Sequence, residues 1–199
     1  MLSTYRSLQE SSGPSVEPVS LADAKTHLHV THSKEDDLIT SMIEVARREV
    51  QRVTARQLIN ATWVMRMDSF PSGSGDIYLP RAPLSSVTTV AYNDANGDAQ
   101  TMTVTTEYLV DVYTVPGRIY LAPNGAWPST YGEPNDVTVT FVAGYGSQAT
   151  DVPENYIHAI KLMVGHLYLY RERFAAGETV TELPTYGDLF YDEQIEYTF

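Results

Sequence analysis

Apolar residues recur with the spacing of one helix face between Lys34 and Arg56. The positions that make up this face are Ile39, Met42, Ile43, Ala46, Val50 and Val53. A shorter helix is predicted from Leu21 to about Leu28, because Ser20 can accept a hydrogen bond from the first turn. We therefore expect two helices near the N-terminus.

A third and longer helix is predicted from Pro153 to Arg173, after a glycine-rich turn that follows Val142. Its main apolar face consists of Ile157, Ile160, Val164 and Leu167, and the face is widened by Ala159, Met163 and Tyr170. Because most of its circumference is apolar or aromatic, this helix must be covered on several sides.

The period changes to strand-like alternation between Leu58 and Val142. The predicted strands are residues 62–67, 77–79, 87–92, 100–105, 108–113, 118–121 and 137–142. Asn96-Gly97 is a strong signal for a tight hairpin turn, and Pro116-Gly117 is typical of a type II turn. The pattern thus predicts a β module between helices that are distant in sequence.

The chain is therefore expected to be α+β, with a small helical bundle, an inserted antiparallel β module and an extended C-terminal tail. Residues 1–17 are polar and predict a flexible N-terminal arm. The helical module comprises residues 18–57 and 151–174, and the β module comprises residues 58–146. Residues 175–199 form a tail with several acidic and aromatic side chains but no Lys or Arg.

Composition narrows the possible functions. The formal net charge is -12, which argues against a protein that grips nucleic acid by neutralising phosphates but is compatible with a wall along which DNA slides. The chain has no cysteine, so it has no disulfide or thiolate metal site and fits a reducing compartment. No apolar run is long enough to predict a membrane span.

No motif in the sequence predicts a catalytic, cofactor or metal site. His27, His29 and His32 are spaced closely enough to ligate a metal, but the first two are expected on different sides of a helix. Asp94 to Asp98 lacks the glycine and glutamate positions of a calcium loop and is interpreted as a hairpin turn. His158 and His166 are interpreted as helix-surface or packed residues. We predict no enzyme, no cofactor and no metal.

A basic stripe on the second helix allows two interpretations. Its residues are Arg47, Arg48, Arg52 and Arg56. The stripe could receive an acidic segment of a neighbouring subunit through charge-assisted hydrogen bonds. Equally, it could be a solvated face with local pairs such as Glu44 with Arg48.

Several segments in order resemble the head-tail connector, or adaptor, proteins of long-tailed double-stranded DNA bacteriophages and phage-like particles. The resemblance extends from about Pro18 to Phe174. It is carried by residues 77–94 (IYLPRAPLSSVTTVAYND), by residues 116–141 (PGRIYLAPNGAWPSTYGEPNDVTVTF) and by the stretch from Ala143 to Glu172 that contains AGYG, DVP and HLY.

The resemblance implies a structural virion protein in the particle neck, assembled in the cytoplasm of a bacterial host. It would form a homo-oligomeric ring, expected to be twelve-fold, beneath the portal protein and above the stopper or tail-terminator protein. Genomic DNA would pass through the lumen without specific binding. From composition, we expect the tail to dock on the portal through Phe190, Tyr191, Ile195, Tyr197 and Phe199.

Two other functions remain open from the sequence. Trp127, Tyr131 and Tyr92 are expected on loops of the β module, where aromatic rings could recognise a glycan in a tail or baseplate protein. An unrecognised hydrolase is a third possibility, but the sequence contains no constellation of residues that supports it.

Overall fold

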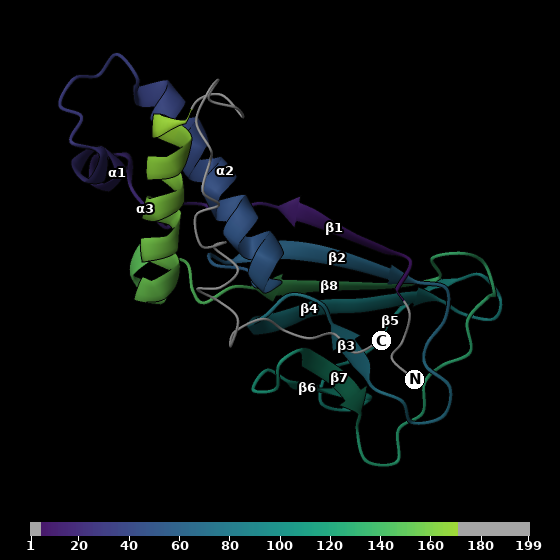
Figure 1. The fold of residues 1–199 in the computed structure, drawn as a ribbon. Helices are drawn as coiled ribbons and strands as arrows, with labels where there is room; N and C mark the ends of the chain where they lie inside the picture. The colour runs from purple at the N-terminus through teal and green to yellow at the C-terminus, as the bar shows by residue number, and fades with distance from the viewer. Residues whose placement is uncertain (1–4, 171–199) are drawn as a thin grey trace, which may run out of the picture.

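The structure is a computed structural model that describes residues 5–170. The described chain has a helical module at one end and a longer β module that extends away from it (Figure 1). Each module has its own hydrophobic core. This mixed architecture confirms the predicted α+β class. None of the helices in residues 5–170 has the length and apolarity to cross a bilayer.

Three helices form the helical module: α1 (Leu21–Leu28), α2 (Asp36–Thr54) and α3 (Glu154–Leu169). As predicted, Ser20 caps α1, and its hydroxyl accepts a hydrogen bond from the backbone N–H of Asp23 at 3.0 Å. The predicted apolar face of α2 packs against α3, where Tyr156, Ile160 and Val164 are buried. The core between them also includes Leu58 and Ile59 from the segment that leads into the β module.

Eight strands form two antiparallel sheets in the described chain. The larger sheet has the order β1-β2-β8-β4-β5, with strands Ser7–Ser12, Ala61–Met67, Val137–Ala143, Leu84–Asn93 and Ala99–Thr101. The smaller sheet has the order β3-β7-β6, with strands Ile77–Leu79, Gly117–Leu121 and Tyr108–Asp111. A short 3₁₀ helix, η1 (Ala149–Asp151), precedes α3.

The core of the β module lies on one face of the larger sheet. Alternate residues of β2 and β8 are buried there, including Met65 and Phe141, and they pack with Ile77 and Ile119 of the smaller sheet. The other residues of β2 and β8 point to the opposite face and are partly exposed. Among residues 5–170, this face of the larger sheet is therefore the open one, with side chains that are partly exposed, as is common in antiparallel sheets.

Several details differ from the sequence predictions: α3 ends at Leu169 instead of Arg173, and the strand predicted at residues 100–105 is limited to Ala99–Thr101. Residues 7–12, predicted as part of a flexible arm, form edge strand β1, because their backbone pairs with β2 although their side chains are polar. The predicted type II turn at Pro116-Gly117 is wrong, because Gly117 has no positive φ and lies in β7. By contrast, the predicted hairpin at Asn96-Gly97 is confirmed: it joins β4 to β5, and Gly97 has a φ of 87°.

Candidate functional site

The first residue of the predicted basic stripe, Arg47, lies inside the protein. Its side chain is only 6% exposed. The guanidinium donates hydrogen bonds to a carboxylate oxygen of Glu17 at 2.8 Å and to the side-chain oxygen of Gln51 at 3.0 Å. Because Glu17 belongs to the segment between β1 and α1, Arg47 ties that segment to α2. The geometry therefore gives Arg47 a structural contact within the chain.

Arg48 and Arg52 both point into solvent, and their side chains are each 70% exposed. Arg48 pairs with Glu44 at 2.6 Å, as the local-pairing interpretation predicts. Arg52 makes two hydrogen bonds to the Glu49 carboxylate, at 2.7 and 2.5 Å, and these bonds lower the pKa of Glu49. Exposed ion pairs of this kind contribute little stability, so both arginines can change partners at small cost.

Arg56 lies beyond the end of α2 and contacts a different part of the chain. Its guanidinium donates a hydrogen bond to the hydroxyl of Tyr145 at 3.1 Å, and that hydroxyl lies 3.4 Å from the hydroxyl of Tyr156. The four arginines therefore do not form one outward-facing stripe. Arg48 and Arg52 remain as the two exposed members.

Most of the aromatic residues that suggested glycan binding pack against other residues of the β module. The indole of Trp127 stacks on Phe70 with ring centroids 5.1 Å apart, and its Nε1 donates to the carbonyl of Gly75 at 2.8 Å. Tyr92 meets the same Phe70 ring edge-on at 5.4 Å. Of the three candidates only Tyr131 is exposed, at 52%. They do not form a shared aromatic platform.

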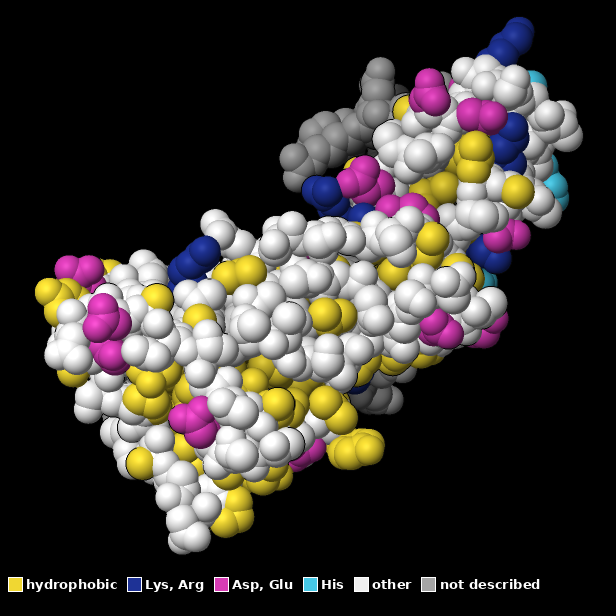
Figure 2. All heavy atoms as spheres, turned by 180° about the vertical axis from the view of Figure 1, so that it is seen from behind, with side chains coloured by type: hydrophobic (Ala, Val, Ile, Leu, Met, Phe, Trp, Pro, Cys, Tyr) yellow, Lys and Arg dark blue, Asp and Glu magenta, His cyan; other side chains and the backbone are white. Residues whose placement is uncertain are grey.

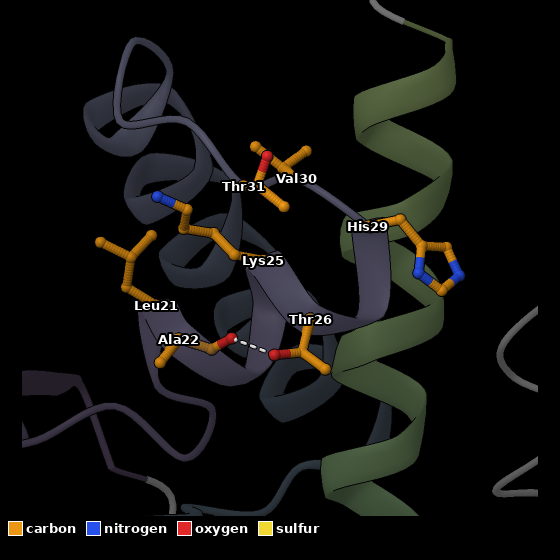
Figure 3. Close-up of a pocket in the computed structure, with 7 residues that line it drawn as sticks. All are labelled: Leu21, Ala22, Lys25, Thr26, His29, Val30 and Thr31. Atoms are coloured by element: carbon orange, nitrogen blue, oxygen red, sulfur yellow. Dashed lines mark hydrogen bonds between the residues drawn. The ribbon is translucent and has the colours of Figure 1, made fainter.

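A shallow groove runs along α1 and the turn that follows it (Figure 3). Its lining mixes apolar side chains such as Leu21 and Val30 with polar ones such as Lys25 and His29. In Figure 3 the His29 ring points away from the other labelled side chains. The Lys25 ammonium is already paired with Asp36 at 2.6 Å. The groove therefore contains no arrangement that indicates a particular ligand.

The histidines do not form a metal site in the described part of the chain. Within residues 5–170, no three side chains of the ligating types come together to hold an ion. His27 packs near Gly165 of α3, and His32 lies 3.9 Å from the Glu35 carboxylate. His158 is exposed, whereas the ring of His166 packs at 5.0 Å from that of Tyr170.

Two contacts were not predicted from the sequence. The partner of Arg47, Glu17, is thirty positions away along the chain, so helical spacing gives no signal for it. Asp136 is buried and accepts hydrogen bonds from the backbone N–H groups of Gly132 and Glu133. The portal-docking residues proposed from composition, Phe190, Tyr191, Ile195, Tyr197 and Phe199, lie outside the described residues.

Comparison with solved structures shows that this fold is found in neck proteins of phage-like particles. A chain from the "Neck of empty GTA particle computed with C6 symmetry" superposes with a TM-score of 0.76 at 21% identity, over 94% of this chain and 95% of that chain. A chain from the "Virion of native gene transfer agent (GTA) particle" gives a TM-score of 0.74 at 19% identity, with 94% of each chain covered.

A third chain, from the "Neck of native GTA particle computed with C12 symmetry", gives a TM-score of 0.73 at 20% identity and again covers 94% of each chain. No curated protein sequence matches this chain significantly. Residues 18–116 match the family described as phage gp6-like head-tail connector protein. These residues include α1, α2 and the strands from β2 to β6. The chain therefore belongs to the phage gp6-like head-tail connector family.

Proposed function

We propose that this protein is a structural subunit of a ring in the neck of a phage or a gene-transfer-agent-like particle. The observation that carries the proposal is the family match over residues 18–116, together with the likeness of nearly the whole chain to proteins from particle necks. The ring joins the DNA-filled head to the stopper or tail. Twelve copies are expected, because one similar neck was computed with C12 symmetry.

The ring lies beneath the portal protein, and its lumen transmits the genome. With a net charge of -12, the protein does not attract the phosphate backbone, so DNA passes without being held. Assembly takes place in the host cytoplasm, which suits a chain without cysteine. The role is non-catalytic and needs no cofactor.

Arg48 and Arg52 are the inter-subunit residues of this proposal. Both are exposed, and each pairs with a glutamate on its own helix, Glu44 being exposed and Glu49 half-buried. An acidic segment of the neighbouring copy can replace those partners through charge-assisted hydrogen bonds. The tail of residues 175–199 carries carboxylates and no cation, and therefore has the matching charge.

The same tail docks on the portal through its aromatic and aliphatic residues, of which Phe190, Tyr191 and Phe199 are three. Truncation after Phe174 should abolish portal binding and leave the melting temperature of the protein nearly unchanged. Retained portal binding by the truncated protein would refute this part of the proposal.

Deletion of the gene in the particle-producing strain tests the function as a whole. Electron microscopy of the lysate should show heads and detached tails lying separately, with DNA lost from open vertices. Complete particles that fail to adsorb would instead support the glycan-binding alternative, in which Tyr131 contributes from the β module.

A further inference from the structure

The open face of the larger sheet has an unusual chemistry for so acidic a protein. Strand register places Gln9, Val64, Thr140 and Thr89 side by side in one row across β1, β2, β8 and β4. The rows on either side of it contain Ser, Thr, Val and Ala residues and one charged residue, Arg66. We call the outward-facing residues of these four strands the hydroxyl face.

The three outward-facing rows of the hydroxyl face contain no carboxylate, although the whole chain contains 25 Asp and Glu residues. Glu10 of β1 pairs with Trp63 and so belongs to the opposite side by register, but it borders the face at the β1 edge, where it lines a surface hollow together with Gln9 and Arg66. Arg66, the one cation, is hydrogen-bonded to Gln9 at 3.0 Å. On the side of the molecule that Figure 2 shows, the magenta carboxylates lie mainly toward the two ends.

The net charge of the chain indicates which kind of partner the hydroxyl face can bind. Two copies that each carry a charge of -12 repel one another, and the repulsion is weakest where neither surface contributes carboxylates. Nucleic acid is a poor occupant, because phosphate binding needs clustered cations and the face provides one. We propose that the hydroxyl face is a contact surface for a second copy of this chain.

The side chains of this face suit such a contact. Ser and Thr are short, so they lose little rotamer freedom on burial. Each hydroxyl both donates and accepts a hydrogen bond, so a facing polar group of either kind can be satisfied. Thr140 and Val64 lie in the two strands at the middle of the row, where a partner would bury them most completely.

The area of the hydroxyl face is too small to form a complete protein–protein interface by itself. Four strands and about six residues along each give roughly 20 Å by 20 Å, or about 400 Å². A standard interface buries about 800 Å² on each partner. The hydroxyl face thus supplies about half of the area that each partner buries in a standard interface. The rest must come from other contacts between copies in the ring. This inference rests on the proposed connector function.

Because the contact forms within a ring, the test uses particles from a strain in which the gene is replaced by variants. Thr140→Glu puts a carboxylate in the centre of the face, and Thr106→Glu is the matched control in an exposed turn away from it. We expect Thr140→Glu to reduce the amount of this protein in purified particles at least about tenfold, while Thr106→Glu enters normally. Incorporation of Thr140→Glu at the wild-type level would overturn the proposal.

Photo-crosslinking identifies the occupant and does not depend on the folding of the Thr140 variant. Thr101 of β5 is exposed and lies beside Ala91 at the border of the face, so it tolerates substitution by p-benzoylphenylalanine. Irradiated particles should yield an adduct of two copies of this chain. An adduct to a different virion protein, or a crosslink confined to one copy, would refute the second-copy contact. Absence of the wild-type protein from the neck would instead refute the connector function.

Discussion

The Arg47 guanidinium is held inside the protein by Glu17 and Gln51. Replacement of Arg47 by Met keeps most of the side-chain volume but leaves the two oxygens without their donor. We expect Arg47→Met to lower the free energy of unfolding by about 1–3 kcal/mol, as for other lost hydrogen bonds to partly buried charges. Urea denaturation followed by circular dichroism measures this difference.

Arg48→Met is the control for that experiment, because Arg48 is on the same helix and its ion pair is exposed. Its effect should stay within about 0.5 kcal/mol. Equal losses for the two variants would show that the contact with Glu17 contributes no more than a surface pair.

The Asp94 carboxylate organises the hairpin turn between β4 and β5. It accepts hydrogen bonds from the backbone N–H groups of Asn96 and Asp98 and from the side chain of Gln100. These bonds, above all the one from Asn96, lower the pKa of Asp94 despite the opposing effect of burial. We expect a titration midpoint below the ordinary value for Asp, about 3.9. Carboxyl carbon NMR measures it.

The sign of the resulting pH dependence follows from that shift. Because the pKa of Asp94 is lower in the folded state, its contribution to stability is present above the ordinary Asp pKa and is lost as pH falls through the lowered value. Gln100→Ala removes one donor and should raise the midpoint slightly. A midpoint at or above the ordinary value in the wild-type protein would contradict the described turn.

Helical spacing does separate Arg47 from Arg48, because Arg47 lies four positions after Ile43 and three before Val50 and therefore borders the buried face of α2. Both were predicted in one basic stripe, and that prediction overlooked the difference in spacing; what spacing could not show is the partner of Arg47, Glu17, whose position depends on the path of the chain from β1 to α1. The Asp94 turn could be predicted because its signal is local, in the Asn96-Gly97 pair. For single residues, the sequence therefore predicted a turn that depends on adjacent residues, but it did not predict a side-chain pair between distant parts of the chain.

At the scale of elements, Gly117 is required by packing between the two sheets. A Cβ atom built on Gly117 would lie 2.5 Å from the Leu84 Cβ and 2.6 Å from its Cδ2. We expect Gly117→Ala to destabilise the protein by about 1–3 kcal/mol, as other overpacking substitutions do. Thermal melting of the purified protein tests the effect.

Gly165→Ala in α3 provides the matched control, since the added Cβ would meet only the His27 ring at an ordinary 3.5 Å. That change should be neutral or stabilising by up to about 1 kcal/mol, because alanine favours helix more than glycine does. If both variants lose stability equally, the close approach of β7 to Leu84 is not the cause.

The elements with strong apolar periodicity were predicted well. The face of α2 and the alternation in β2 and β8 locate the two cores correctly. β1 was missed because its side chains are mostly polar, and an edge strand is stabilised by backbone pairing that leaves no hydrophobic pattern. The proline-glycine pair at Pro116 was misread as a turn, because the need for Gly117 comes from Leu84, which lies 33 positions earlier in the sequence.

At the scale of the whole molecule, the proposed ring places Arg48 and Arg52 between copies. Arg48→Glu combined with Arg52→Glu should reduce particle yield, because each change puts a carboxylate where an acidic segment of the neighbour is expected. The isolated variant should melt within a few degrees of the wild-type protein, since both side chains are exposed. Unchanged particle yield would show that these arginines do not contact another copy.

The central claim is that the protein forms a ring in the particle neck. A cryo-electron microscopy reconstruction of that region tests it most directly, in particles from the strain that produces this chain. We predict a closed ring of copies between head and tail, with density for α2, α3 and the two-sheet β module in each copy. A neck without this fold, or density for it in a fibre or baseplate, would contradict the account.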